Sequence, residues 1–297
     1  MARPYLGRHV YGLAAGLFGL VALDWHDFNI WQQIRTLGDV SHRGTLVYIY
    51  AAIELVGGIA IQWRKTARAG AAALGAISLV FAWLWVPFIA AKPQVYDYWG
   101  NFFEQFSLVS GALIVYATVD ESDTKRSAML ARIGYICFAL CVISFTLEQL
   151  FYLSGTASFV PNWIPPGQMF WAIVTTIAFA LAALALFTGF WDLLASRLLT
   201  AMIIGFGLLI WLPAPFVDPH KQINWAGNAE NLAIAGAAWI VADFLTQCRR
   251  ASMAVVAAAG GGGEPLGLRT VRGEDVSTAH RRIVFALLCT PLNTTRS

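Results

Sequence analysis

The chain has 297 residues, of which 58% are hydrophobic and only 12% are charged. Soluble domains carry about 25% charged residues, so a chain this apolar could not cover the surface of a soluble protein. The net charge of +3 comes from basic residues in loops and in residues 249–297, which form no basic face with interleaved aromatics, so we expect no nucleic-acid partner.

Eight apolar segments follow one another along the chain, each near the length of about 20 residues that a helix needs to cross a bilayer. Because the membrane interior offers the backbone no other partners, we predict an all-α polytopic membrane bundle of about eight transmembrane helices. Residues 249–297 contain no run of spanning length and are predicted to be a low-complexity, disordered tail. The predicted spans lie near residues 8–28, 45–63, 67–90, 99–118, 129–153, 168–188, 194–213 and 225–246.

Two parts of the chain carry the same residues at the same spacing, which indicates an internal duplication. A gapless alignment of residues 85–115 with 211–241 pairs Trp85 with Trp211, Pro87 with Pro213, Pro93 with Pro219, Trp99 with Trp225 and Glu104 with Glu230. Upstream, a shift of 124 residues pairs Arg8 with Arg132, Tyr11 with Tyr135 and Asp24 with Glu148. We therefore predict one four-helix repeat in residues 1–122 and a second in residues 123–248. An even number of spans in each makes the two repeats parallel.

The distribution of lysine and arginine between short loops predicts the orientation, because cytoplasmic loops carry the excess. With the N-terminus inside, the inner segments hold nine such residues and the outer segments four. We therefore expect a protein of the bacterial cytoplasmic membrane with both termini in the cytoplasm. The inner residues are Arg3, Arg8, Arg64, Lys65, Arg68, Lys125, Arg126, Arg132 and Arg197, and the outer ones are Arg35, Arg43, Lys92 and Lys221.

Five carboxylates lie in the outer half of the predicted spans or at their edge: Asp24, Glu54, Glu104, Glu148 and Glu230. A charge inside a membrane is costly, so such residues usually face the bundle interior and are paired or protonated. They are candidates for binding a ligand, such as a quinol hydroxyl, or for passing protons. The alternative is structural, with Glu104 and Glu230 holding the two repeats in register.

His26 follows the first span in the sequence DWHD, where it could form a small metal- or quinol-binding group with Asp24 and Asp27; a solvated turn is the alternative. No span has a histidine well inside it, so we expect no intrinsic haem. Cys137 and Cys141 share a helix face, where they either pack in an apolar run or carry redox chemistry. We assign no catalytic residue and no metal ligand.

The outer ends of the predicted spans are rich in tryptophan and tyrosine. Such residues form either an aromatic belt at the lipid headgroups or the aromatic mouth of a cavity. The uncharged residues 154–167 could lie flat on the outer surface or dip into it. We assign a structural role to the aromatic and proline residues that the repeats share: Trp85, Trp211, Pro87, Pro213, Trp99 and Trp225.

Four stretches resemble the DoxX family of small four-helix membrane proteins, here as a tandem pair. They are the arginine that opens each half (Arg8, Arg132), Glu54-Leu-Val-Gly-Gly, residues 151–189, and the NFFEQFSLVSGAL segment. The resemblance covers residues 6–246 and implies association with membrane redox systems, among them subunits of quinol oxidases and of thiosulfate:quinone oxidoreductases. Some members carry histidine where this chain has Gln149 and Phe179, so no histidine-based site is carried over.

The residues and the resemblance together lead to three hypotheses. The first is a non-catalytic subunit of a membrane redox complex that contacts quinone between the two halves, has no intrinsic cofactor, and has the bilayer and other redox subunits as partners. The second is a small-molecule or proton-coupled transporter that uses the carboxylates at the repeat interface. The third is a membrane enzyme of thiol exchange that uses Cys137 and Cys141. No motif of a hydrolase, kinase or nucleotide-binding enzyme occurs in the chain, so the first is favoured.

Overall fold

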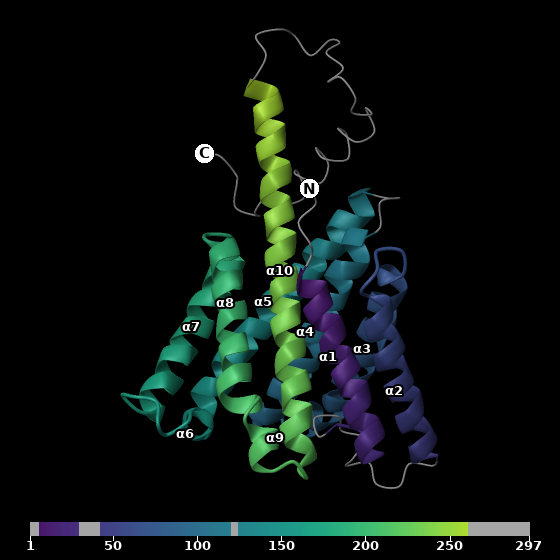
Figure 1. Ribbon diagram of the computed structural model, residues 1–297. Coiled ribbons are helices and arrows are strands. Elements are labelled where there is room, and N and C mark those ends of the chain that lie inside the picture. Colours follow the sequence, from purple (N-terminus) through teal and green to yellow (C-terminus); the bar gives the residue numbers. More distant parts are fainter. Residues whose placement is uncertain (1–5, 30–41, 120–123, 261–297) are drawn as a thin grey trace.

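The computed structural model describes residues 6–29, 42–119 and 124–260, and within these ranges the chain is helical, with short connections and no strand (Figure 1). Eight helical segments of this part are long and apolar enough to cross a membrane, which confirms the predicted polytopic bundle. The first half holds α1 (Leu6–Trp25), α2 (Arg43–Ala60), α3 (Ala67–Ala91) and α4 (Tyr96–Val119). The second half holds α5 (Thr124–Phe151), α6 (Leu153–Phe159), α7 (Gln168–Thr188), α8 (Asp192–Phe206), η2 (Gly207–Trp211), α9 (Ala214–Val217) and α10 (Gln222–Gly260).

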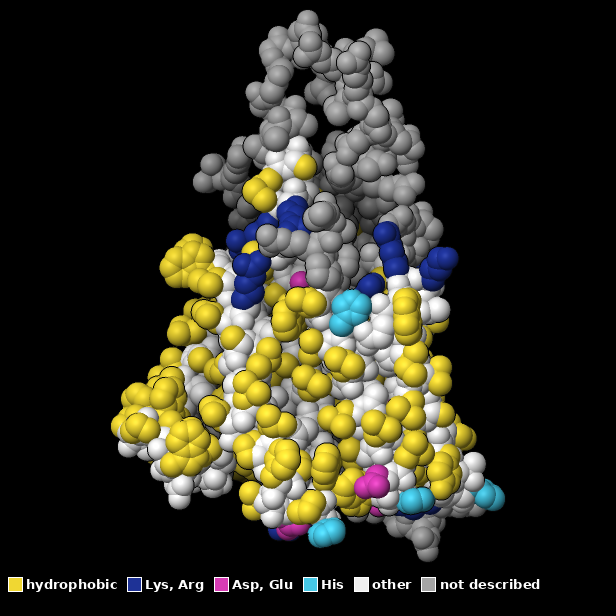
Figure 2. All heavy atoms as spheres, viewed as in Figure 1, with side chains coloured by type: hydrophobic (Ala, Val, Ile, Leu, Met, Phe, Trp, Pro, Cys, Tyr) yellow, Lys and Arg dark blue, Asp and Glu magenta, His cyan; other side chains and the backbone are white. Residues whose placement is uncertain are grey.

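The face of the bundle seen in Figure 2 is largely apolar between its two ends. Apolar side chains such as Val56 and Trp83 are 66% and 68% exposed. In water such a surface would promote aggregation, whereas in a bilayer these side chains contact lipid tails. Lysine and arginine side chains gather mainly at the end where α1 begins and α10 ends (Figure 2). The chain is therefore an integral membrane protein with an uneven distribution of basic residues between its two ends.

The helices pack as two equivalent sets of four. In the first half α1 contacts α2, α2 contacts α3 and α3 contacts α4; α5, α7, α8 and α10 repeat this order in the second half. Between the halves, α1 packs against α10 and α5 packs against α4, while α4 and α10 pack against each other. Each of these contacts has its counterpart under exchange of the two halves, which is the pattern of a pseudo-twofold axis along the α4–α10 contact.

The burial pattern gives the register between the halves more finely than the sequence match. The buried residues Val47, Ala51 and Gly57 of α2 have their counterparts 125 residues later in Ala172, Thr176 and Ala182 of α7. In the same way Ala71, Leu74 and Ser78 of α3 correspond to Ser196, Leu199 and Ile203 of α8. The shift becomes 126 only at Trp85 and Trp211.

The second half thus contains one extra residue between Ile203 and Trp211. The helix takes it up at η2, where the π-type bond from the Leu212 amide to the Gly207 carbonyl spans five residues at 2.7 Å. A π turn accommodates one additional residue without ending the helix, and such turns are frequent at functional sites. In the first half α3 continues as an α-helix through the equivalent stretch, with Pro87 inside it.

Tryptophan and proline make the same contact at the start of the last helix of each half. The indole N–H of Trp99 donates to the Pro93 carbonyl at 3.1 Å, and that of Trp225 donates to the Pro219 carbonyl at 3.0 Å. The bond ties the first turn of α4 or α10 to the connection that precedes it. The two repeat-equivalent tryptophans therefore make equivalent hydrogen bonds.

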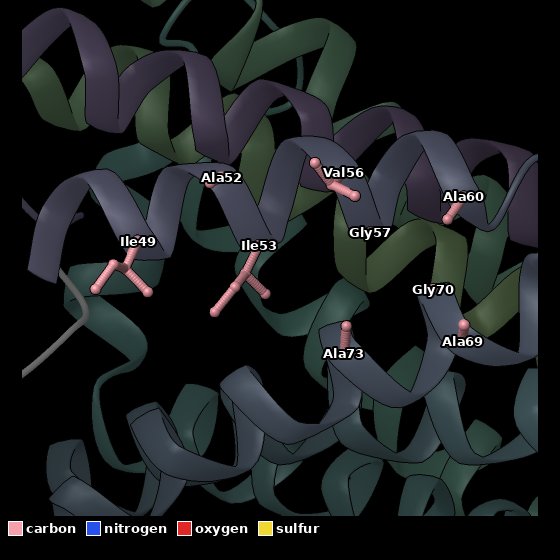
Figure 3. Close-up of a pocket in the computed structure, with 9 residues that line it drawn as sticks. All are labelled: Ile49, Ala52, Ile53, Val56, Gly57, Ala60, Ala69, Gly70 and Ala73. Atoms are coloured by element: carbon pink, nitrogen blue, oxygen red, sulfur yellow. The ribbon is translucent and has the colours of Figure 1, made fainter.

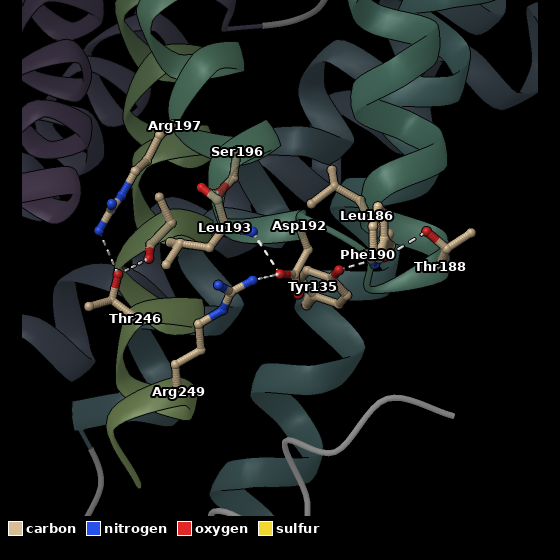
Figure 4. Close-up of polar contacts among 11 residues, drawn as sticks. Tyr135, Leu186, Thr188, Phe190, Asp192, Leu193, Ser196, Arg197, Thr246 and Arg249 are labelled. Atoms are coloured by element: carbon tan, nitrogen blue, oxygen red, sulfur yellow. Dashed lines mark hydrogen bonds and ion pairs between the residues drawn. The ribbon is translucent and has the colours of Figure 1, made fainter. Parts of the chain in front are cut away.

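At the other end of the bundle the helices of the second half are joined by polar contacts (Figure 4). Arg249 of α10 forms an ion pair with Asp192 at the start of α8, with 2.6 Å between Nη2 and Oδ1. Gly189 ends α7 in the left-handed conformation, with φ of 72°, which glycine adopts without strain. The helix α10 itself runs on to Gly260, so residues 249–260, expected as the beginning of the tail, are helical; residues 261–297 lie outside the described ranges.

Candidate functional site: a carboxylate-lined cavity in the second half

A cavity of about 730 Å³ lies among the helices of the second half and the adjoining ends of α3 and α4. Most of its lining is apolar or aromatic, with Trp85, Trp171 and Trp211 among the rings. Three glutamates reach it from three different helices: Glu104 from α4, Glu148 from α5 and Glu230 from α10. The structure therefore gathers three of the five carboxylates that the sequence placed at one depth.

Glu230 is the most buried of the three, with 5% of its surface exposed. Its carboxylate accepts hydrogen bonds from the side-chain amide of Gln105 on α4, at 3.2 and 3.4 Å. The repeat equivalents of these two residues are Glu104 and Asn231, so the bond crosses between the halves at matching positions. Glu230 consequently has both a structural partner and a face toward the cavity.

The carboxyl of Glu148 lies against the backbone of Gly100 on α4, where even a single Cβ would overlap it. Close approach of α4 and α5 at this glycine brings Glu148 and Glu104 to the same cavity. Neither carboxyl forms a hydrogen bond or ion pair with a residue in the described ranges, and no lysine, arginine or histidine is among the described residues that line the cavity. The acids are thus available to a ligand.

The carboxamide of Gln149 also lines the cavity. The side-chain oxygen of Gln149 accepts hydrogen bonds from the hydroxyls of Thr176 at 2.9 Å and Thr175 at 3.3 Å. This fixes the orientation of the amide, because its oxygen is already held by α7. Its N–H₂ group donates to no residue in the described part of the chain and can donate to a ligand oxygen.

The segment 154–167 does not lie apart from the bundle but covers the cavity. Residues of α6 and of the turn after it line the cavity, and the centroid of the Phe159 ring lies 6.2 Å from that of the Trp211 ring, which also lines it. Gln168 donates to the Val160 carbonyl at 2.5 Å, which closes the turn onto the start of α7. The segment thus forms part of the cavity wall.

The other predicted site residues lie elsewhere. Asp24, in the last turn of α1, and His26, just after it, are exposed. The His26 ring contacts the Asp24 backbone carbonyl at 3.2 Å and the Tyr48 ring edge-to-face, and Asp27 pairs with Arg43. No group of three metal-ligating side chains occurs among the described residues. Glu54 is 6% exposed inside the first half and lines no part of the cavity, although it is close enough to Glu230 to interact with it electrostatically.

The two cysteines of α5 do not form a surface pair. Cys141 is fully buried and Cys137 is half-buried in the same apolar helix. Thiol exchange needs a thiol that its partner can reach, so this arrangement favours packing. The burial of these two cysteines therefore does not support the hypothesis of a thiol-exchange enzyme.

A second hollow of about 470 Å³ opens between α2 and α3 in the first half (Figure 3). All nine residues that line it are aliphatic or glycine, and two of them, Ile49 and Val56, are strongly exposed on the lipid-facing surface. Without a polar group it can select no ligand by hydrogen bonding. Its apolar lining and its opening between exposed apolar side chains suit contact with lipid tails.

Comparison with known proteins adds no relative to this description. No family model matches the chain, and no curated protein or solved structure is significantly similar to it. The function is therefore argued from the chemistry of the site. That chemistry is a membrane-embedded, largely apolar and aromatic cavity. Three glutamates, Asp97 and the oriented carboxamide of Gln149 are among its polar lining.

Proposed function

We propose that the protein is a non-catalytic accessory subunit of a quinone-linked redox system in the membrane, and that its cavity receives a quinone or quinol head group. The observation that carries the proposal is the convergence of Glu104, Glu148 and Glu230 on one apolar, aromatic cavity inside a membrane bundle. The resemblance of four stretches to the DoxX family supports the redox neighbourhood. No electron-carrying group is required of the chain itself.

The cavity offers the contacts that such a head group needs. Its volume falls within the range of about 300–1,000 Å³ that small-molecule sites occupy. Quinol hydroxyls can donate to the unpaired carboxyl oxygens of Glu104 and Glu148, and the Gln149 amide can donate to a quinone carbonyl. The apolar remainder of the lining suits the ring and the beginning of an isoprenoid tail.

We further propose that the membrane is the bacterial cytoplasmic membrane, with the cavity in its outer half. The basic residues at the end where α1 begins support a cytoplasmic location for that end, since cytoplasmic loops carry the excess of lysine and arginine (Figure 2). The helix α10 ends on the same side as α1 begins (Figure 1). Both ends of the described bundle then face the cytoplasm.

The decisive experiment is mild purification from native membranes, followed by mass spectrometry of the proteins and quinones that accompany the chain. We expect bound quinone, redox-enzyme subunits, and a higher melting temperature with a short-tailed quinone. The changes Glu148→Gln and Gln149→Leu should weaken quinone binding by about tenfold, or about 1.4 kcal/mol. Asp24→Asn is the matched control, because Asp24 is the repeat equivalent of Glu148 and lies outside the cavity. A chain that purifies alone and does not respond to quinone contradicts the proposal.

A proton-coupled carrier is the second candidate, and one observation favours it. Glu104 and Glu230 are repeat equivalents, and both reach a single cavity beside the α4–α10 contact, where the halves would move against each other. Carriers with parallel repeats bind their substrates at such an interface. Substrate flux into liposomes that stops in the Glu104→Gln, Glu230→Gln double variant, without any quinone binding, would favour this function over the first.

A further inference from the structure

The burial register that relates α2 to α7 places Tyr50 and Thr175 at equivalent positions. Val47 and Ala51 on either side of Tyr50 correspond to Ala172 and Thr176 around Thr175, with the same shift of 125. Thr175 lines the cavity, whereas Tyr50 is 2% exposed in the first half. The duplicated positions therefore differ by a phenol ring, which is present in one half and missing in the other.

In the first half this ring is enclosed on all sides. Tyr50 lies 5.2 Å from the Phe81 ring in an edge-to-face contact and 5.7 Å from the Phe28 ring. Its hydroxyl accepts a hydrogen bond of 2.8 Å from the side-chain amide of Asn29. All of these residues are almost completely buried, so they fill the space between α1, α2 and α3.

The second half has an aromatic ring and a side-chain amide comparable to those around Tyr50, but no ring at the position of Tyr50 itself. The shift of 125 makes Phe206 the equivalent of Phe81, and Phe206 lines the cavity instead of packing on a tyrosine. The amide of Gln149 stands beside Thr175 with its N–H₂ free for a ligand oxygen, the role that Asn29 plays toward Tyr50. An aromatic wall and a carboxamide donor are thus present in both halves, around a ring in one and around a cavity in the other.

We infer that the residue at the equivalent positions 50 and 175 decides which half of the chain holds a ligand. In the first half the Tyr50 ring occupies the place that the ligand takes in the second half. The ligand class that follows is a six-membered ring with an oxygen substituent, such as a phenol, quinol or quinone. The inference rests on the proposed ligand-binding role of the cavity and narrows it. Thr175 becomes the residue that sets the specificity of the site.

One test restores the missing ring. Thr175→Tyr should place a ring in the part of the cavity beside Gln149 and reduce the affinity for a short-tailed quinol by about tenfold or more, because the added ring occupies the place of the ligand's head group. Ile177→Tyr is the matched control, since it adds a similar side chain to the lipid-facing side of the same helix. Unchanged quinol affinity in a folded Thr175→Tyr protein would overturn the inference.

A second test requires no ligand. A small water-soluble thiol reagent should label Phe206→Cys about tenfold faster than the equivalent Phe81→Cys, after subtraction of the labelling of the parent chain, since only the first lines a cavity. Adding Thr175→Tyr to Phe206→Cys should slow the labelling, and adding Tyr50→Thr to Phe81→Cys should accelerate it. Melting temperatures verify that each variant is folded.

The two tests separate the inference from the proposed function. Equal labelling at positions 81 and 206, with no effect of the second changes, overturns the inference whatever the quinol measurements give. The predicted labelling pattern without any binding of quinone or quinol keeps the one-sided cavity and overturns the proposed ligand. The predicted labelling pattern together with weakened quinol binding in Thr175→Tyr supports both.

Discussion

Gly111 of α4 and Ala237 of α10 face each other at the centre of the bundle, although they are 126 residues apart in the chain. A Cβ on Gly111 would lie 3.0 Å from the Ala237 Cβ. The shift of 126 is the one that relates Glu104 to Glu230, so the two residues are equivalents that meet each other. Such a meeting is possible only on the axis that relates the halves, and small residues allow the two helices to approach there.

The first prediction concerns this contact. Gly111→Leu should destabilise the protein by about 1–3 kcal/mol, because its side chain would separate α4 from α10. Gly16→Leu adds the same side chain where no atom lies within 4 Å and should change the stability little. Unfolding in mixed detergent micelles measures the difference, and equal stabilities of the two variants would show that the α4–α10 contact is loose.

The second prediction concerns the hydrogen bond between Gln105 and Glu230. Gln105→Leu removes the donor and leaves a buried carboxyl without its partner, so we expect a loss of about 1–3 kcal/mol in the free energy of unfolding. The double variant Gln105→Leu, Glu230→Leu should recover most of this loss, because no orphaned polar group is left. A double variant as unstable as the sum of the two single changes would mean that the residues act independently.

The third prediction uses the repeated bond from tryptophan to proline. Trp99→Phe and Trp225→Phe each remove one hydrogen bond while keeping an aromatic ring, and each should cost about 0.5–1.5 kcal/mol of stability. Trp163→Phe is the control, because the Trp163 side chain is 70% exposed and bonds to no described residue. If only one of the two equivalents matters, the bond has lost its role in the other half.

The fourth prediction tests the parallel arrangement directly. Lys92 and Asp218 are repeat equivalents that precede α4 and α10, and they should lie on the same, outer side of the membrane. Alkaline phosphatase fused after either residue should be active, and fusion after Lys65 or Arg250 should leave it inactive. Green fluorescent protein fused at the same four sites should give the opposite pattern. Opposite results at Lys92 and Asp218 would mean inverted repeats.

The spans could be predicted from the sequence because each depends only on the length and hydropathy of one segment. The cavity could not, because a carboxylate reaches it only if its helix is rotated the right way. Glu104, Glu148 and Glu230 lie in the predicted outer half and meet there, whereas Asp24 lies at the same predicted depth and faces outward. Rotation is set by packing against other helices, which hydropathy does not describe.

Thr175 was not named from the sequence, and Gln149 was named only as a position where some DoxX members carry histidine. Uncharged polar residues are common in membrane helices, where they bond to neighbouring carbonyls, so they give no signal by themselves. The signal lay in the comparison of the halves at a shift of 125, which pairs Tyr50 with Thr175 and Glu54 with Phe179. Those positions share no residue, so an alignment that seeks identities passes over them.

The extra residue that η2 accommodates is present in the second half and absent from the first, so the two halves have diverged since the duplication. In a symmetric dimer of identical four-helix subunits, an insertion would appear on both sides of the axis at once. The residues at positions 50 and 175 would also be identical in such a dimer, so a cavity would be present in both subunits or in neither. Joining the copies into a single polypeptide freed each to change without the other. The one-sided cavity is therefore a property that fusion made accessible and that no homodimer of either half could have acquired.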